Sequence, residues 1–396
     1  MGNNLLSAIY FHPEAFPPTL NATGELSKLF DQIYLLYRPH LKNEWKFDAN
    51  VSLVASGAEM TVQQQEQSST WKKIKFFFNF TRTMFQLIKE HRPTVVLVYD
   101  AIPLLSFYLV KKLINNPPKL WYHNHDVTEK ERLKKYSIGW LAAEVEQKMF
   151  AQMDIFSLPS QERKRYFPME QLLGEYIFLP NLPSWKFYGQ FKDKVKDEQS
   201  LRLLYQGSIG KGHGIEELLQ LMPFEINGKP IKLVLKGFLK QPFKGELDDI
   251  IEGRNLQGQV EIHGVTPYKD VPRITSSCHI GIAIFSRNDI MNNTLGTASN
   301  KIYEYAACGL PVLYYNSDHY SNHLGKFKWA VPTDLTKRSL IDSIQCIDSH
   351  HAEFSRAARE DFESGLKYEI AFSNVVEVLT RVNELGIAIS NQGCNQ

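Results

Sequence analysis

The sequence predicts an α/β protein of two domains. It has 396 residues, more than the roughly 100–200 residues of one ordinary domain. Short runs of β-branched and aromatic residues alternate with longer segments of helical period, which is typical of βαβ units with largely parallel sheets. A polar stretch, FYGQFKDKVKDEQS at residues 187–200, separates two such series and indicates a solvated linker. We therefore expect two Rossmann-like domains.

The first domain, residues 1–190, is expected to hold seven strands with helices between them. The strands are predicted at Leu5–Tyr10, Gln32–Tyr37, Val51–Ala55, Thr94–Tyr99, Lys119–Tyr122, Asp154–Leu158 and Tyr176–Leu179. The helices are predicted at Trp71–His91, Ile102–Ile114 and Trp140–Gln152.

The second domain, residues 200–365, repeats the alternation. Its strands are predicted at Leu201–Gln206, Ile231–Lys236, Val260–His263, Ile280–Ile284 and Pro311–Tyr315. Its helices are predicted at Ile215–Leu221, Leu247–Gly253, Val271–Ser276 and Asn300–Ala307. The chain is expected to be helical from about Ser339 to Leu385, and residues 366–396 are predicted to pack back toward the first domain and end in a frayed tail.

Composition and charge exclude several classes of protein. Hydrophobic residues make up 43% of the chain and charged residues 22%, as in folded proteins. Lys and Arg number 45 against 43 for Asp and Glu, so no overall field favours nucleic acid as a partner. The four cysteines lack metal or disulfide spacing, which indicates reduced thiols and a cytoplasmic protein. With no signal peptide or membrane-spanning run apparent, we expect a protein that is soluble or peripheral to a membrane.

The strongest local signal is NTLGTASNKIYEYAACGLPVLYYN, residues 293–316. It predicts a polar loop, an amphipathic helix from Asn300 that stops at Gly309, and then a strand. Free N–H groups at such a helix start lie at the carboxyl edge of the sheet, where anionic ligands bind. Lys301 adds positive charge there, and Glu304 is placed to accept hydrogen bonds from a ribose diol. The alternative is that Glu304 is a surface carboxylate favoured by the helix dipole.

The run E-Y-A-A-C-G-L-P-V, from Glu304 to Val312, resembles the nucleotide-sugar signature of family-4 (group 1) retaining glycosyltransferases of the GT-B fold. The resemblance covers nearly the whole second domain and implies that Glu304 binds the donor ribose. It also implies that two Rossmann-like domains face each other across a cleft, braced by the C-terminal helices. The first domain would then bind the acceptor, and the second would bind the nucleotide-sugar donor.

A glycine-rich segment, LLYQGSIGKGHGIEELLQL at residues 203–221, predicts a strand, a tight turn and a helix. Glycines let backbone amides approach a phosphate closely, and the turn leads into a helix N-terminus. The residues expected to contact the donor are Gly207, Ser208, Gly210, Lys211 and Gly212. The family that the chain resembles has basic residues where this chain has Ser208 and His213. Lys211 is therefore expected to supply the charge near the diphosphate, unless it is a solvated turn residue.

In the first domain, KLWYHNHDVTEK at residues 119–130 ends a buried strand with polar residues at its carboxyl edge. It resembles the family's strand that ends in His-Asp or His-Glu, whose His contacts the donor sugar near the bond that breaks. His125 matches that residue and is the expected catalytic residue. His123 and Asp126 are interpreted as a structural histidine near the strand end and a capping or turn aspartate. Further candidates in the loop expected after the first strand are Thr19, Asn21 and Gly24.

Together these features predict a metal-independent glycosyltransferase that uses a nucleoside diphosphate sugar and a glycan or lipid-linked acceptor. The resemblance implies retention of the anomeric configuration and a place in surface polysaccharide or glycoconjugate biosynthesis. No metal is expected because no D-x-D motif ends a strand, and no other cofactor is called for. Two alternatives stay open: a nucleotide-sugar epimerase of the same fold, and a non-catalytic donor-binding scaffold subunit.

The segment 70–93 raises the question of membrane contact. Helical spacing predicts a core-facing stripe made of Ile74, Phe77, Phe78, Thr81, Phe85 and Ile88. A basic and aromatic patch, of the kind found at bilayer interfaces, is then left by Trp71, Lys72, Lys73, Lys75, Phe76, Phe80 and Arg82. One interpretation is that the patch contacts the inner face of the cytoplasmic membrane. The alternative is that the extra aromatics pack under loops of the first domain.

Overall fold

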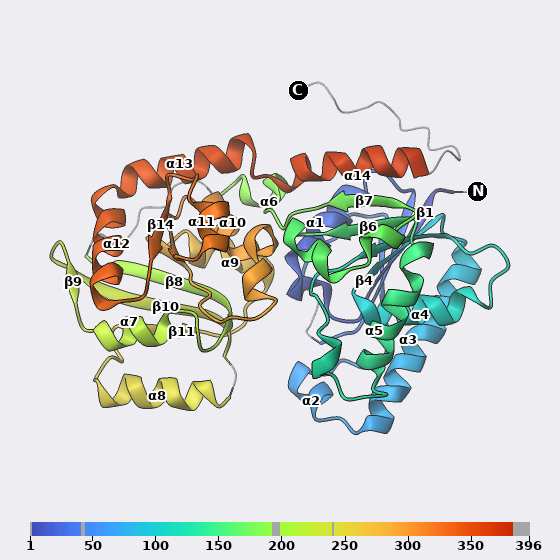
Figure 1. Ribbon diagram of the computed structural model, residues 1–396, viewed down its shortest axis with the longest axis horizontal. Coiled ribbons are helices and arrows are strands. Elements are labelled where there is room, and N and C mark those ends of the chain that lie inside the picture. Colours follow the sequence, from blue (N-terminus) through green and yellow to red (C-terminus); the bar gives the residue numbers. More distant parts are fainter. Residues whose placement is uncertain (1, 41–43, 192–198, 240, 383–396) are drawn as a thin grey trace. The chain divides into compact units, whose positions relative to one another are not determined.

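The structure, a computed structural model, describes residues 2–40, 44–191, 199–239 and 241–382. The chain divides into two compact units, Met1–Pro180 with Ala371–Gln396 and Asn181–Ile370 (Figure 1). Each unit is built on a sheet of parallel strands with helices packed against it, so the predicted α/β class is confirmed. The chain leaves the first unit at Pro180, earlier than the boundary at 190 that the sequence suggests.

The sheet of the first unit has the strand order β3-β2-β1-β4-β5-β6-β7, and every neighbouring pair is parallel. The strands are β1 (Asn4–Ile9), β2 (Gln32–Tyr37), β3 (Val51–Ala55), β4 (Val95–Tyr99), β5 (Lys119–His123), β6 (Ile155–Leu158) and β7 (Glu175–Phe178). All seven lie where the sequence predicts them. The strand order reverses between β1 and β4, and open α/β sheets bind ligands at the carboxyl ends of the strands at such a point.

Helices α3 (Thr70–His91), α4 (Ala101–Lys111) and α5 (Ile138–Met149) match the predicted helices and pack side by side, with the short α2 (Val62–Glu66) before them. Helix α1 (Pro17–Leu26) occupies half of the segment, residues 11–30, that we expected to be a loop after the first strand. Two prolines open α1, at positions where a helix has no use for their missing N–H groups. The expectation of an open loop is therefore wrong for residues 17–26.

Helix α3 turns a different face to the core from the one that the sequence predicts. Its buried residues are Phe77, Phe80, Met84, Leu87 and Ile88. Phe80, which we expected in the surface patch, is fully buried, and Phe78, which we expected in the core, is 58% exposed. The helix carries more aromatic residues than one stripe can hold, so its spacing alone allows two choices of buried face.

The sheet of the second unit runs β11-β10-β8-β12-β13-β14 with all pairs parallel, and β9 pairs antiparallel with β10. The strands are β8 (Leu201–Ile209), β9 (Glu225–Ile226), β10 (Lys229–Leu239), β11 (Val260–His263), β12 (Ile280–Ala283), β13 (Val312–Tyr315) and β14 (Ala330–Thr333). Strands β9 and β14 are not among those predicted from the sequence. The strand order reverses between β8 and β12, which again marks the expected ligand-binding edge.

Helices lie on both faces of this second sheet (Figure 1). They are α7 (Ile215–Leu221), α8 (Phe243–Gly253), α9 (Val271–Thr275), α10 (Asn300–Ala307), α11 (Asp318–Leu324), α12 (Lys337–Ser349) and α13 (His351–Ser364). Helices α7 and α9 begin at the predicted residues, α12 begins near its predicted start and α10 has the predicted bounds. Helix α8 begins one turn before its predicted start at Leu247, and α11 was not predicted.

The polar stretch expected to be a solvated linker is ordered where the structure describes it. Its start overlaps helix α6 (Trp185–Tyr188), and Tyr188 is fully buried. The Arg359 guanidinium donates to the carbonyl oxygens of Tyr188, Gly189 and Ala307, the last at 2.5 Å. Charged composition led us to expect solvent exposure, but the aromatic residues at 187–188 decide the packing. Residues 192–198 lie outside the described residues.

Helix α14 (Tyr368–Val382) begins in the second unit and ends in the first. Within the first unit, Arg381 Nη2 lies 3.3 Å from Glu175 Oε2 at the start of β7. The predicted frayed tail, SNQGCNQ at residues 390–396, lies outside the described residues, which stop at Val382.

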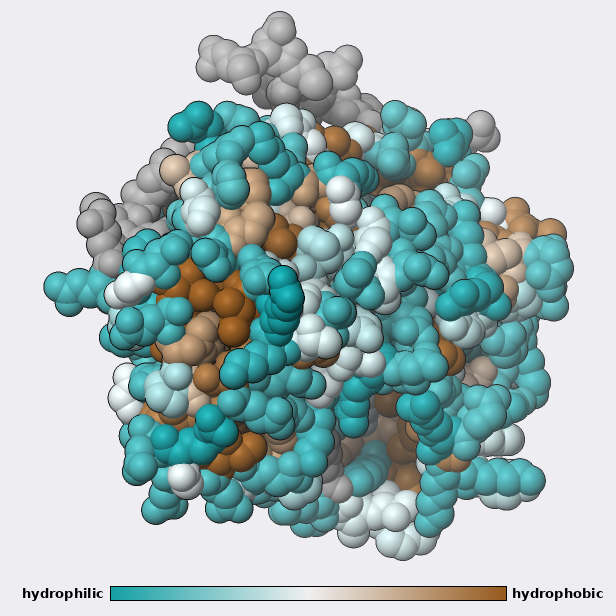
Figure 2. All heavy atoms as spheres, turned by 60° about the vertical axis from the view of Figure 1, so that its left-hand side comes forward, coloured by the Kyte–Doolittle hydropathy of each residue, from teal (hydrophilic) through white to brown (hydrophobic). Residues whose placement is uncertain are grey.

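Among the described residues, no helix is long and apolar enough to cross a membrane. The face drawn in Figure 2 is mostly hydrophilic, with separate apolar patches between the polar side chains.

Candidate functional site

Lys301 joins the two predicted donor motifs of the second unit. It stands in the first turn of α10, which follows β12, and its Nζ donates to Tyr205 OH on β8 at 2.9 Å. The ammonium lies 4.1 Å from the Tyr205 ring centroid and 5.0 Å from that of Phe285. A Cβ placed on Gly207 would lie 3.2 Å from Lys301 Nζ. The start of α10 and the glycine-rich segment therefore meet at the carboxyl edge where the strand order reverses.

Burial lowers the pKa of the Lys301 ammonium to about 7, and the nearby Glu304 carboxylate only partly opposes this effect. Among the described residues, Lys301 Nζ forms no ion pair within 4 Å. An anion brought next to this nitrogen would favour the charged ammonium and restore its ordinary pKa.

Glu304 is 5% exposed, so it is not the surface carboxylate that we held open as an alternative. Its Oε2 accepts from Gln206 Nε2 at 2.6 Å, and its Oε1 accepts from Tyr268 OH at 2.9 Å. Thr275 Oγ1 in turn donates to Gln206 Oε1 at 2.9 Å, which fixes the orientation of that amide. Burial raises the pKa of Glu304, while these donors and the charge of Lys236 lower it. Each carboxylate oxygen still has acceptor capacity for a ribose hydroxyl.

Gly207 lies within β8 and not in the turn that we expected. It pairs with Gly237 on β10, and the two glycines have φ of +119° and +131°. Any Cβ on Gly237 would clash with the carbonyl of Gly207. The tight turn itself runs from Gly210 to Gly214 before α7, and Gly212 has φ +80°. Glycine is required at these positions by backbone conformation and close approach.

In the structure Lys211 forms an ion pair with Glu246 on α8. Its Nζ lies 2.5 Å from Glu246 Oε2 on α8, and its side chain is 53% exposed. Arg287, which the sequence did not single out, instead packs against Gly212. The backbone N–H of Ser286 donates to Gly212 O at 2.9 Å and holds this neighbouring segment in place. Arg287 is therefore a second positive charge next to the turn.

The remaining predicted donor residues lie at the same edge. Ser208 is exposed at the end of β8, and its carbonyl accepts from Tyr205 OH at 2.9 Å. Asn300 is the half-buried first residue of α10. His213 stacks on Tyr205 with ring centroids 4.8 Å apart. Burial, together with the charges of Lys301 and Arg287, lowers the pKa of His213 to about 3. His213 is thus a neutral packing residue.

In the first unit His125 lies directly beyond β5 and is 4% exposed. Its Nδ1 lies 3.3 Å from Asp100 Oδ2, and its backbone N–H donates to Asp100 Oδ1 at 2.7 Å. Its ring stacks on Tyr99 at 4.9 Å and 15°, with Phe16 5.0 Å away at 34°. The carbonyl of His125 accepts from the buried Arg163 guanidinium. The ring is therefore held on three sides, while its Nε2 is buried and has no hydrogen-bond partner among the described residues.

The sequence analysis did not predict a role for Asp100 in the site. It follows β4 as His125 follows β5, and adjacent parallel strands bring the two residues together. Its backbone has φ +65° and ψ +173°, an uncommon conformation for a residue with a side chain. The available signal was an aspartate directly after the buried run VVLVY.

Of the two neighbours of His125, His123 has the structural surroundings that we expected. His123 is 2% exposed, its Nδ1 is 2.8 Å from Ser157 Oγ, and burial lowers its pKa well below the usual value. Asp126 lies 3.9 Å from Arg163 Nη1 and has a largely exposed side chain. Of the candidates near the first strand, Thr19 and Asn21 are buried in α1 and Gly24 is half-buried there. None of the three lies in an open loop.

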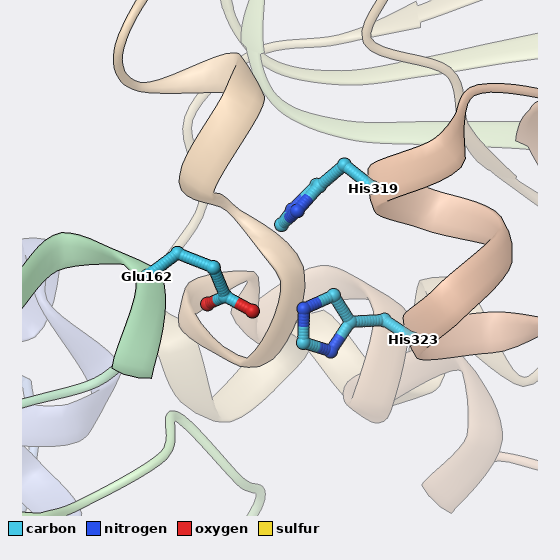
Figure 3. A group of neighbouring side chains, drawn as sticks. All are labelled: Glu162, His319 and His323. Atoms are coloured by element: carbon cyan, nitrogen blue, oxygen red, sulfur yellow. The ribbon is translucent and has the colours of Figure 1, made fainter.

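Figure 3 shows His319 and His323 on α11, with ring centroids 4.8 Å apart. His319 Nε2 accepts from the backbone N–H of Gly296 at 3.0 Å. The third side chain drawn there, Glu162, belongs to the first unit. Within either unit taken alone, the described residues hold no group of three His, Cys, Asp or Glu ligands placed to share a metal ion.

Part of this chain matches a known protein family, and nearly all of it resembles known folds. Residues 189–359 match the model of a family described as glycosyl transferases group 1. The whole chain resembles sucrose-phosphate synthase from Thermosynechococcus elongatus, with TM-score 0.71 and 11% identity over 96% of this chain and 99% of that one. No curated protein sequence matches this chain significantly.

Two further solved structures share the fold. HepE of Anabaena, in complex with UDP-glucose, has TM-score 0.64 and 12% identity over 96% of this chain and 99% of that one. WaaG, a glycosyltransferase involved in lipopolysaccharide biosynthesis, has TM-score 0.65 and 13% identity over 94% of this chain and 99% of that one. At such low identities these likenesses show the fold, which is the GT-B fold expected from the sequence.

Proposed function

We propose that this chain transfers a sugar from a nucleoside diphosphate sugar, and the premise is the match of its residues 189–359 to the model of glycosyl transferases group 1. The observation that carries the proposal is the meeting of Lys301, Glu304 and the glycine-rich segment at one sheet edge. In this proposal Glu304 binds the ribose, while backbone amides of Gly207, Ser208, Gly210 and Gly212 and the start of α10 at Asn300 bind the diphosphate. The solved UDP-glucose complex of HepE supports a donor of this class.

In this proposal Lys301 and Arg287 balance the negative charges of the diphosphate, in place of Lys211. Positive groups fixed before the reaction stabilise the charge that develops on the leaving diphosphate, so a metal ion is not needed for that step. In this proposal His125, a residue of the first unit, contacts the donor sugar through its Nε2, which has no partner among the described residues. Retention of configuration follows only from the family resemblance. No cofactor takes part in this scheme, and EDTA is expected to leave turnover unchanged.

The acceptor is proposed to be a glycan or a lipid-linked glycan in a surface polysaccharide or glycoconjugate pathway, as the likeness to WaaG suggests. A cytoplasmic site of action is part of this proposal and agrees with the buried, reduced thiol of Cys278. An epimerase of the same fold would convert donor alone into a second nucleotide-sugar. A scaffold subunit would bind donor and change nothing.

Donor binding is expected to raise the melting temperature of the protein, because a ligand that binds only the native state stabilises it by mass action. The measurement is a thermal-shift series with UDP-, GDP-, ADP- and dTDP-sugars, followed by incubation of the best donor alone. An epimerised sugar in that incubation would favour the epimerase, and the absence of stabilisation by every donor would contradict the proposal.

The affinity for the diphosphate donor is expected to fall as the pH rises above about 7, because free Lys301 loses its proton there. Below that pH the ammonium is charged before the donor binds. Above it, binding takes up a proton, which weakens affinity by up to about tenfold per pH unit until the pKa of the complex is reached. Titration calorimetry in buffers of different ionisation enthalpy measures both the affinity and the proton uptake.

Lys301→Met is expected to remove this pH dependence, and Lys211→Met is its matched control. If Lys211→Met weakens the donor and Lys301→Met does not, the diphosphate charge lies on Lys211 as the sequence suggested.

We also propose contact with an anionic membrane, through residues of α3 that differ in part from those predicted from the sequence. One side of α3 carries four exposed side chains at spacings of four, three and four residues. They are Trp71, Lys75, Phe78 and Arg82. Trp71 is 80% exposed. We call these four residues the α3 stripe. An exposed stripe that alternates aromatic and basic side chains fits a bilayer interface.

The protein is expected to co-sediment with anionic liposomes at low salt and to be released by salt, since each basic residue near the surface contributes about 1 kcal/mol. Changing Lys75 and Arg82 together to Glu should release it. Changing Lys111 and Lys112 at the end of α4 to Glu alters charge equally and serves as the control. If the parent protein stays in the supernatant, the acceptor is not presented by a membrane through this helix.

A further inference from the structure

We propose that a buried cluster of nitrogen atoms in the first unit, formed by Arg38, His12 and His40, binds a phosphate group of the acceptor. Arg38 follows β2 and is 0% exposed. Its Nη1 donates to Ser56 O at 2.5 Å, but its Nε and Nη2 are buried without a hydrogen-bond partner among the described residues. That this phosphate belongs to the acceptor rests on the proposed function, whereas the anion site itself does not.

The guanidinium of Arg38 has little to balance its charge. The nearest compensation is the face of Phe76 on α3, 4.4 Å from Cζ, and that of Tyr10 at 5.8 Å. No carboxylate lies within ion-pair distance of Arg38 in the part of the chain that the structure describes. A buried charge without a partner destabilises a fold strongly, and buried arginines are normally paired. An anion that binds here would remove that cost.

Two histidines add unpaired nitrogens to the same region. His12 follows β1 and is 0% exposed, and its Nδ1 accepts from the Glu14 N–H at 3.3 Å, so in the neutral ring Nε2 carries the proton. His40 is 2% exposed, with Nδ1 3.2 Å from Met60 O. The Nε2 atoms of both rings are buried without a partner among the described residues.

Contacts through Phe11, the residue before His12, place these three side chains in the same region. Arg38 N donates to Phe11 O at 3.4 Å, and the ring centroids of Phe11 and His40 lie 4.3 Å apart. Burial, helped by the charges of Arg38 and His12, lowers the pKa of His40 to about 4. Burial likewise lowers the pKa of His12 to about 4, with Glu59 opposing that shift. Both rings are therefore neutral near pH 7. His12 offers an N–H donor, and an anion beside His40 would favour its protonation into a second donor.

The chemistry of this cluster favours phosphate. A guanidinium presents parallel N–H groups that match phosphate oxygens, and charge-assisted bonds of this kind are the strongest in proteins. The cluster lies beyond the carboxyl ends of β1 and β2, the edge at which open α/β sheets bind ligands. The free edge of the guanidinium is closed to solvent, so the phosphate has to displace covering side chains such as Phe76.

The test compares Arg38→Gln with Arg165→Gln, which removes the same charge from an exposed position of the same unit. Inorganic phosphate, against chloride at equal ionic strength, is expected to raise the melting temperature of the parent and of Arg165→Gln. Arg38→Gln should melt at or above the parent temperature without phosphate, because an unpaired buried charge is gone. It should also weaken phosphate binding by at least about tenfold in titration calorimetry.

Arg38→Lys keeps the positive charge but loses the parallel N–H groups of the guanidinium, so it should also weaken phosphate binding. It replaces Arg38→Gln as the test variant if Arg38→Gln fails to fold. Nucleotide-sugar affinity should be the same in the parent and in both variants. Equal phosphate shifts in parent and Arg38 variants, or no shift in the parent, would overturn the site. A matching loss of nucleotide-sugar affinity would assign the anion to the donor and overturn the acceptor role. Failure of the glycosyltransferase proposal would leave the phosphate titration unaffected.

Discussion

Glu304→Gln is expected to weaken nucleotide-sugar binding by about 10–100-fold, because a charged acceptor contributes about 1.5–3 kcal/mol per hydrogen bond. The buried carboxylate already accepts from Gln206 and Tyr268, so its geometry is fixed before the ribose arrives. Glu304→Ala is a poorer probe than the sequence suggested. It would leave both donors unpaired in the interior at about 1–3 kcal/mol each, and so destabilise the fold as well.

Donor affinity is measured by titration calorimetry, and the melting temperature is recorded separately to detect loss of stability. Glu252→Gln on the exposed side of α8 is the control for removing a negative charge from the same unit. If Glu304→Gln binds the donor as tightly as this control, the ribose lies elsewhere and the donor site is wrongly placed.

His125→Ala is expected to lower turnover by about 100-fold while donor affinity changes little, as for a contact made mainly in the transition state. Asp100→Asn should reproduce most of that loss. Asp100 accepts from Nδ1–H in the neutral ring, which leaves Nε2 as a hydrogen-bond acceptor for a sugar hydroxyl. An asparagine can turn its amide N–H toward Nδ1 and favour the other tautomer, in which Nε2 carries the proton.

The tautomer is read from the ¹⁵N chemical shifts of His125, and kcat is followed apart from KM. Asp126→Asn is the matched control, since this neighbouring carboxylate is exposed and faces Arg163. A merely structural role for Asp100 would lower stability in Asp100→Asn without moving the tautomer. Equal losses in donor affinity and turnover for His125→Ala would indicate a ground-state contact.

The sequence predicts most of the strands because each short apolar run in a parallel sheet is an almost independent local signal. The same holds for Lys301 and Glu304, which stand three residues apart on one amphipathic helix. Their partners cannot be found in that way. Gln206 and Tyr268 come from β8 and from the segment before α9, and only the strand order brings them to Glu304.

The roles of charged side chains also depend on tertiary contacts that the sequence does not reveal. Lys211 stands where a phosphate-binding residue is wanted, but its partner Glu246 lies on a helix whose position depends on packing. Arg287 is unremarkable in the sequence and becomes a candidate only through its contact with Gly212. On α3, too many aromatic residues compete for one buried face, and tertiary contacts decide that Phe80 enters the core.

The paired glycines of β8 and β10 set a limit on how this site can be re-engineered. A side chain at Gly237 would press on the carbonyl of Gly207, and Gly207 borders the Lys301 ammonium. The position of the backbone that we propose binds the diphosphate is thus fixed partly by a missing side chain on the neighbouring strand. Libraries that randomise the residues lining the donor should therefore hold Gly207 and Gly237 constant together, and transplanting the 203–221 segment into another scaffold requires a glycine opposite it.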